Sequence, residues 1–248
     1  MSQKISDENK IIFVDIGTHI GQEINSFTNY NYLLLKILKR VIKKIFKKKV
    51  NFKKDFKYFS QLIKTHNQLR RLLDHISLVT VEPNTRHFHH FVYKISSLVI
   101  PLAIDDRSKD IQMIKFFIAN ENILSQGNSI YKSKKNINKD NYFYVPAISS
   151  NILINLIKNY SNNSEPKIIL RLNCEGSEDD LIYKFKEEFG ANLLGVLGSL
   201  KDVKIKGDSK YENLISYIEE NNIKFLPFGT DIESWLNAHK FILSCIRN

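Results

Sequence analysis

The sequence has few of the residues that mark disulfide-rich or membrane-spanning proteins. Its 248 residues include two cysteines, five prolines and one tryptophan. Cys174 and Cys245 lie far apart in the chain and form neither a disulfide framework nor a C-x-x-C metal pattern. No stretch reaches the roughly 18 to 20 uncharged apolar residues that span a bilayer. The N-terminal "MSQKISDENK" also lacks the apolar core of a signal peptide. We therefore expect a cytoplasmic protein with reduced thiols.

Acidic residues are almost missing from one segment, residues 36–71. This segment holds 14 Lys plus Arg and a single acid, Asp55, so its own formal charge is +13. The whole chain has a formal net charge of +11, so the remaining residues together sum to −2. Three interpretations remain open for it: a solvated lid over the domain, a surface for anionic lipid or a lipid-linked glycan, and a nucleic-acid surface.

Short apolar runs alternate with segments of helical periodicity along the chain. This alternation is typical of a parallel sheet covered by helices on both faces. The predicted strands are residues 11–15, 78–82, 98–104, 168–174, 193–197, 223–228 and a seventh near Lys240. The predicted helices are residues 21–30, 86–94, 149–160, 178–189 and 211–221. We expect one α/β domain over residues 1–248, with a seven-stranded sheet flanked by helices.

Residues 31–76 interrupt this alternation after the first strand and helix. On a helix, one side of their first half would be apolar, formed by Leu34, Leu35, Leu38, Val41, Ile42, Ile45 and Phe46. The other side would be basic, formed by Lys36, Lys39, Arg40, Lys43, Lys44 and Lys47. In the second half, apolar residues recur at spacings of three and four. The pattern predicts a basic amphipathic helical hairpin inserted after the first βα unit.

The turn "VDIGTHIG" follows the first predicted strand. The strand ends at Asp15, and Gly17 and Gly21 bracket the turn. Glycine suits such a turn because it tolerates positive φ and lets the backbone approach a ligand. A dinucleotide fingerprint would place glycine near position 15. The acid there disfavours a diphosphate and favours a positively charged ligand such as S-adenosylmethionine, unless the turn is purely structural.

Glu82 ends the second predicted strand, in "LVTVEPN". A carboxylate at this place in a Rossmann-like sheet can accept both ribose hydroxyls of an adenosine. Such an acid lies about 20 residues beyond the glycines, and the spacing of Glu82 is similar once residues 36–71 are removed. Taken alone, an acid that ends a strand is more often solvated or caps a helix.

The segment "IILRLNCEGSEDDLI" places Asn173, Glu175 and Glu178 where a predicted strand meets a helix. Side chains at the carboxyl end of a central parallel strand face the crevice where open α/β sheets bind ligands. In the alternative interpretation, the acids from Glu178 onward only stabilise the N-terminal end of the helix through its dipole.

Five segments in order resemble the FkbM-type family of S-adenosylmethionine-dependent methyltransferases: "FVDIGTHIGQE", "VTVEPN", "PLAIDD", "NSIYKS" and "PKIILRLNCEGSEDDLI". The family typically shows a D-x-G-x-x-x-G turn, an E-P-N strand end, a strand ending in an acid, a small loop with serine, and K-[IL]-D-[VI]-E-G-[AS]-E. The resemblance covers most of the chain outside the insertion. It implies a seven-stranded Rossmann-like sheet and O-methylation of a sugar or related hydroxyl.

The resemblance also implies roles for individual residues. The methionine part of the cofactor would lie against Asp15, Gly17, His19 and Gly21. The ribose would lie on Glu82 near Asn84, the adenine amino group near Asp105, and the reacting centre near Asn173, Glu175 and Glu178. Glu175 is the first candidate general base and His19 the second. The sequence departs from the family pattern at His19 (usually Asn), Arg171 (usually Lys) and Asn173 (usually Asp), and an amide at 173 cannot accept the proton.

Other interpretations remain open. The chain could be a cofactor-binding scaffold of weakened activity, with residues 36–71 holding an anionic membrane or nucleic acid. An NAD-dependent sugar enzyme is disfavoured by the acid at position 15. The cluster "RHFHH" suggests metal binding, but no Cys or acid accompanies it at ligand spacing, so we expect no metal and place His87, His89 and His90 on a helix surface. Neither the oligomeric state nor the methyl acceptor follows from the sequence.

Overall fold

The structure is a computed structural model of the chain. It describes residues 10–46, 52–107, 110–120, 122–125, 127–132, 134, 136–163, 165–174, 176–229 and 231–247. For residues 44, 45, 52–54 and 205 it describes the backbone alone.

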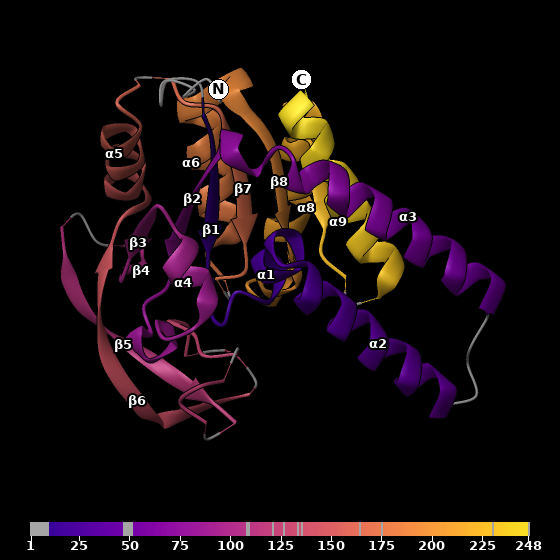
Figure 1. Cartoon of the computed structure of the whole chain (residues 1–248). Coiled ribbons are helices and arrows are strands. Elements are labelled where there is room, and N and C mark those ends of the chain that lie inside the picture. Colours follow the sequence, from indigo (N-terminus) through magenta and orange to yellow (C-terminus); the bar gives the residue numbers. More distant parts are fainter. Residues whose placement is uncertain are drawn as a thin grey trace.

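Helices and strands alternate along most of the chain (Figure 1). The strands are β1 (Ile11–Ile16), β2 (Ile76–Val81), β3 (Leu98–Ile100), β4 (Ala103–Ile104), β5 (Gln112–Ala119), β6 (Ile137–Ile148), β7 (Ile168–Leu172), β8 (Leu193–Gly198) and β9 (Phe225–Pro227). The α-helices are α1 (Gln22–Thr28), α2 (Tyr30–Phe46), α3 (Phe52–Arg70), α4 (Phe91–Ile95), α5 (Ser150–Ser161), α6 (Glu178–Phe189), α7 (Lys201–Ile205), α8 (Asp208–Glu220) and α9 (Ile232–Arg247).

The central sheet has six strands in the order β3-β2-β1-β7-β8-β9, and every neighbouring pair is parallel. The chain builds outward from β1 to β3, then returns to place β7 on the other side of β1. The strand order therefore reverses between β1 and β7. In open α/β sheets, ligands bind beyond the carboxyl ends of the strands at such a reversal.

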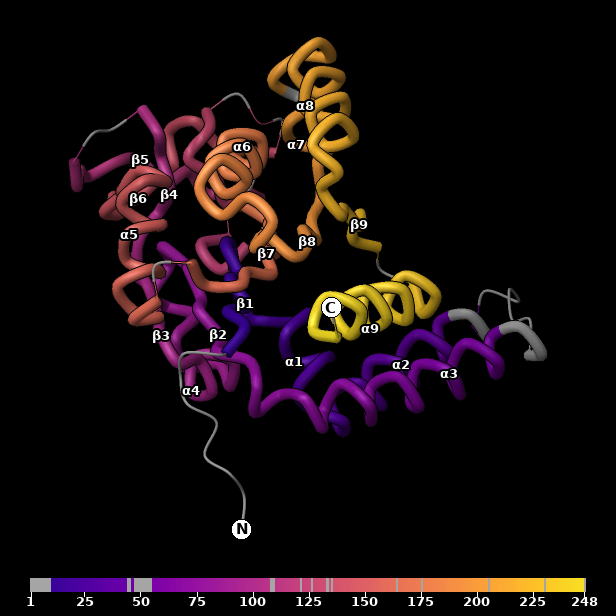
Figure 2. Tube along the Cα trace, turned by 90° about the horizontal axis from the view of Figure 1, so that it is seen from above, coloured from indigo at the N-terminus to yellow at the C-terminus, as the bar shows by residue number. Residues whose placement is uncertain are grey.

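Helices cover both faces of this sheet, as Figure 2 shows from above. Leu153 of α5, Phe185 of α6 and Leu214 of α8 pack on one face. Phe27 of α1 and Ile242 of α9 pack on the other. Strands that are buried on both faces are continuous apolar runs. This explains why every residue of β1 except Asp15 is apolar. The predicted α/β class with a mainly parallel sheet flanked by helices is confirmed.

Helices α2 and α3 project from one side of the domain and run alongside α9 (Figures 1 and 2). Leu33 of α2, Leu62 of α3 and Trp235 of α9 share one buried cluster. Because α9 also packs on the sheet through Ile242 and Cys245, it joins the two helices to the domain.

The predicted seventh strand near Lys240 is wrong, because this segment lies in α9. Its buried residues Ile232, Leu236, His239 and Leu243 recur at spacings of three and four, which is the period of a helix. The alternation of short apolar runs in the earlier chain does not extend to this end.

A second sheet has the strand order β4-β6-β5, and its strands come between β3 and α5 along the chain. This sheet was not predicted. Residues 98–104, predicted as one strand, divide at Pro101 into β3 of the central sheet and β4 of the small one. Strand β6 is polar from Asn138 to Asn141 and apolar from Tyr142 to Ile148, and only residues near its end are buried.

Candidate functional site

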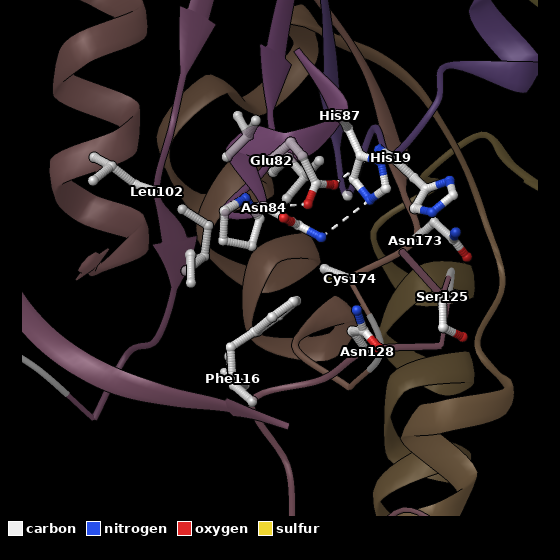
Figure 3. A pocket seen from close by; sticks show the side chains of 17 residues that line it. His19, Glu82, Asn84, His87, Leu102, Phe116, Ser125, Asn128, Asn173 and Cys174 are labelled. Carbon is white, nitrogen blue, oxygen red and sulfur yellow. Dashed lines mark hydrogen bonds between the residues drawn. The ribbon is translucent and has the colours of Figure 1, made fainter. Parts of the chain in front are cut away.

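One cavity lies where β1, β2 and β7 end, beside the strand reversal (Figure 3). The residues that line it are Ile16, Gly17, His19, Val81, Glu82, Pro83, Asn84, His87, Leu102, Ala103, Ile104, Phe116, Ser125, Asn128, Ile130, Asn173 and Cys174. Five residues predicted for the site therefore share its wall: Gly17, His19, Glu82, Asn84 and Asn173. The cavity is narrow, at about 50 Å³.

Gly17 forms the closest backbone contact in this site. Its φ is +76°, and a Cβ atom there would lie 2.0 Å from the carbonyl oxygen of Asn173. Only glycine therefore allows the β1 turn to lie against the end of β7. Gly21 also has a positive φ, but a Cβ there would meet the side chain of Val92. The structure thus gives Gly21 a packing role between α1 and α4, outside the cavity lining.

Asp15 lies beneath the turn and does not line the cavity. Its Oδ1 accepts a hydrogen bond of 2.8 Å from Nη1 of Arg171, and the two side chains are 1% and 4% exposed. Burial raises the pKa of Asp15, and the attraction of Arg171 opposes this effect. Arg171 also donates to the Gly17 carbonyl and to Glu23, so it ties the turn to β7 and α1. The other oxygen of Asp15, Oδ2, is buried without a partner among the described residues.

Glu82 connects the end of β2 to the β1 turn. Its Oε2 accepts the backbone N–H of His19 at 2.8 Å, and its Oε1 accepts the backbone N–H of Asn84 at 2.9 Å. The residue is 5% exposed, and burial raises its pKa to about 7 despite the two N–H donors. A carboxylate offers about four lone pairs, so Glu82 can accept two further hydrogen bonds from a ligand.

A loop segment, residues 122–125, is hydrogen-bonded to two residues of this site. His19 Nε2 donates to the Leu124 carbonyl at 2.9 Å, and Asn84 Nδ2 donates to the Ile123 carbonyl at 2.8 Å. Because a carbonyl can only accept, Nε2 of His19 carries a proton and its Nδ1 presents a lone pair in the neutral ring. This Nδ1 is buried and has no partner in the described part of the chain. Burial is also the main cause that lowers the pKa of His19.

His87 belongs to the cavity wall, so its predicted place on a helix surface is wrong. It is buried, and its ring lies 4.0 Å from the ring of His19. Burial and the neighbouring histidines lower its pKa to about 4. A short 3-10 turn at Thr85–His87 directs it inward, which helical periodicity could not indicate. No group of three His, Cys, Asp or Glu side chains that could hold a metal occurs among the described residues.

Most of the remaining wall is apolar and comes from the predicted strand 98–104, from β5, and from the segment "NSIYKS". Leu102 and Ile104 adjoin β4, Phe116 lies on β5, and Ile130 follows in the loop beyond it. The small sheet therefore contributes Ala103, Ile104 and Phe116 to this wall. Asp105 stands just beyond this wall, where its carboxylate binds Arg107 through bonds of 2.7 and 2.8 Å.

The end of β7 contributes a polar edge. Asn173 is held by its backbone N–H to the Ile16 carbonyl, and its side chain borders the cavity (Figure 3). Glu178 instead turns back on its own loop, where it accepts the backbone N–H groups of Cys174 and Gly176 at 3.1 and 2.8 Å. It is buried, and burial raises its pKa to about 7. Glu178 therefore fastens the loop before α6 and does not line the cavity. Glu175 lies outside the described residues.

Comparisons with protein-family models, with curated proteins and with solved structures find no match to this chain. In the part of the chain that the structure describes, no helix is both long and apolar enough to cross a membrane.

Proposed function

We propose that the chain is an S-adenosylmethionine-dependent methyltransferase of the FkbM type that methylates a hydroxyl of a sugar or glycan precursor. The observation that carries the proposal is Glu82, a buried carboxylate with free lone pairs at the carboxyl end of β2. It borders a cavity at the reversal of strand order, which is the ligand position of open α/β sheets.

Three features of the residues fit this cofactor. Glu82 can accept the ribose hydroxyls, and the apolar wall with Ile104 and Phe116 suits an adenine ring. The carboxylate of Asp15, whose Oδ2 has no partner among the described residues, lies below the turn at Gly17, and its charge favours a positively charged amino group on the cavity side of the turn. Arg171 holds the other oxygen of Asp15, so the carboxylate is fixed in place but partly neutralised.

The cavity must widen to admit the cofactor. Its volume of about 50 Å³ is far below the roughly 300 to 1,000 Å³ of sites for drug-sized ligands. The segment 122–125 closes it through two hydrogen bonds, to His19 and Asn84. We therefore expect cofactor binding to break both bonds and release the side chains of His19 and Asn84 toward the ligand.

When bound, S-adenosylmethionine supplies a methyl group that its sulfonium charge already activates. The protein must then orient the acceptor hydroxyl and remove its proton. The Asn173 amide can hydrogen-bond the hydroxyl but cannot take the proton. We assign that step to Nδ1 of His19, because its lone pair is free and the lowered pKa keeps the ring neutral near pH 7. Glu175 remains the other candidate base.

Isothermal titration with S-adenosylhomocysteine tests the proposal. We expect wild-type protein to bind, and Glu82→Gln to bind at least about tenfold more weakly, since it loses a charged acceptor for the ribose. Glu219→Gln, on the exposed side of α8, is the matched control and should bind like wild type. Thermal unfolding of each variant shows whether the fold is kept. Absence of binding by wild type, or equal binding by folded Glu82→Gln, would overturn the assignment.

A second function, binding to an anionic membrane surface, is favoured by one observation on α2 and α3. Leu35, Leu38, Ile42 and Phe46 of α2 and Phe56 of α3 are exposed, and Phe46 is 83% exposed. We call these five residues the apolar stripe. Exposed apolar side chains beside lysines suit a lipid surface, whereas a nucleic-acid surface needs mainly cations and stacking groups.

Sedimentation with vesicles tests this second function. We expect binding to vesicles that contain phosphatidylglycerol, and its loss in Leu38→Glu with Phe46→Glu. Leu156→Glu on α5 is the control, because Leu156 is also an exposed leucine on a helix but lies far from the stripe in sequence and on another face. Binding of a single-stranded RNA in place of vesicles, unaffected by the double substitution, would assign the hairpin to nucleic acid instead.

A further inference from the structure

A second cavity adjoins the cofactor cavity at the carboxyl end of β7. Its volume is about 430 Å³, and Asn173 lines both cavities. Helix α2 forms one wall, while Arg171 and Trp235 contribute to the others. Because Asn173 lines both cavities, a molecule bound in the second cavity can place a hydroxyl against Asn173. We call the second cavity the basic cleft.

Four cations of α2 line the basic cleft: Lys36, Lys39, Arg40 and Lys43. Their spacing of three and four residues places them on one side of the helix. Glu23 is the only acid in the lining, and it already binds Arg171 at 3.0 Å. The lining therefore carries five cations and one acid, a formal charge of +4.

Two of these cations are partly removed from water and have no ion pair with an acid among the described residues. The Lys36 ammonium lies 4.8 Å from the centre of the Trp235 ring, and burial lowers its pKa although Glu23 raises it. The Nε of Arg40 is buried, and no partner for it exists among the described residues. The charge of Arg40 helps to lower the pKa of Asp231, but the Asp231 carboxylate accepts hydrogen bonds from the backbone N–H and the hydroxyl of Ser234. Poorly solvated cations of this kind are stabilised when an anion enters.

We propose that the methyl acceptor is a phosphate ester whose phosphate group binds in the basic cleft to Lys36, Lys39, Arg40 and Lys43, while its hydroxyl lies at Asn173. This inference rests on the proposed methyltransferase function. Phosphate fits better than a single carboxylate, because it carries up to two negative charges and three terminal oxygens that several donors can share. The same chemistry occurs in a sugar phosphate and in a lipid phosphate.

Trp235 provides the assay, since it is the single tryptophan of the chain and its ring borders the cleft beneath Lys36. Its fluorescence is titrated with glucose 1-phosphate, with a lysophosphatidate, which carries both a phosphate and a free hydroxyl, and with glucose and glucuronate as controls. We expect a saturable change with a phosphate ester that weakens as salt is added. A response to glucose 1-phosphate identifies a sugar phosphate acceptor, and a response to lysophosphatidate alone identifies a lipid phosphate acceptor. No response to either, or an equal response to glucuronate, would overturn the proposal.

Substitutions locate the binding group. Arg40→Gln should weaken phosphate binding about tenfold, from the loss of one charge-assisted contact. Lys57→Gln, an exposed cation of α3 outside the cleft, should bind like wild type. Equal loss in both variants would show a diffuse charge effect and refute the cleft.

The two proposals fail separately. If S-adenosylhomocysteine binds but no phosphate ester does, the acceptor inference falls and the cofactor assignment stands. If phosphate esters bind without S-adenosylhomocysteine, the cleft is an anion site of a protein that is not a methyltransferase, and the acceptor inference falls as well.

Discussion

The buried pair of Arg171 and Asp15 gives the sharpest test of how the β1 turn is held. Replacing Arg171 with Met removes the partner of a carboxylate that is 1% exposed, together with the bonds to the Gly17 carbonyl and Glu23. Breaking a buried ion pair from one side costs about 3 to 5 kcal/mol. We expect Arg171→Met to lower the free energy of unfolding by about this amount near pH 7.5, measured by urea unfolding with circular dichroism.

This cost should depend on pH in a defined direction. Burial already raises the pKa of Asp15 above 3.8, and Arg171 is the largest opposing cause, so the substitution raises it further. A carboxyl whose folded pKa is raised stabilises the fold when protonated, and this stability is lost as pH rises through the folded pKa. The cost of Arg171→Met should therefore be smaller near pH 5 than near pH 7.5, with a slope of at most about 1.4 kcal/mol per pH unit.

Two further variants separate this reasoning from a general loss of packing. Adding Asp15→Asn to Arg171→Met removes the unpaired charge and should recover part of the lost stability at pH 7.5. Lys184→Met breaks an exposed pair with Glu187 and should cost less than about 1 kcal/mol. A cost of Arg171→Met below about 1 kcal/mol, or one equal at both pH values, would refute a buried charged pair.

Three other predictions concern the same framework. Gly17→Ala should destabilise the fold by at least about 2 kcal/mol, and more than Gly190→Ala, because only Gly17 would bring its Cβ against backbone atoms; urea unfolding of both variants decides this. The folded pKa of Glu82 is about 7, so the free energy of unfolding of the wild type should decrease as pH rises from 5 to 8. This decrease should be smaller in Glu82→Gln, and an unchanged pH profile would contradict the prediction. Leu62→Ala should cost about 2 to 5 kcal/mol, whereas Leu35→Ala should cost less than about 0.5 kcal/mol, because Leu62 is fully buried and Leu35 is 57% exposed; equal costs would show that the hairpin does not pack on α9 as described.

The strands that build the site were predictable because they are buried on both faces. The predicted ranges 11–15 and 78–82 agree with β1 and β2 to within two residues at each end. Asp15 and Glu82 were identified for the same reason, as acids that end apolar runs. The small sheet was not predicted, because it depends on the pairing of β5 with β6, which are separated along the chain. The inward position of His87 was not predicted, because a 3-10 turn has no helical period. Leu102 and Ile104 lie within the predicted strand 98–104, but no local pattern showed that β5 brings Phe116 to the same wall.

The sequence by itself determined that parallel strands end in a glycine turn, an acid and an amide, and that the whole excess of positive charge lies in one segment. Periodicity and charge are local properties, and neighbouring residues carry them. Only the tertiary structure decided how these groups are used. It pairs Asp15 with Arg171 across 156 positions of the chain, and it turns four cations of α2 toward Asn173. The first contact follows from the register of β1 against β7. The second depends on how α9 packs against both the hairpin and the sheet. Both are set by packing between segments that are distant in the sequence.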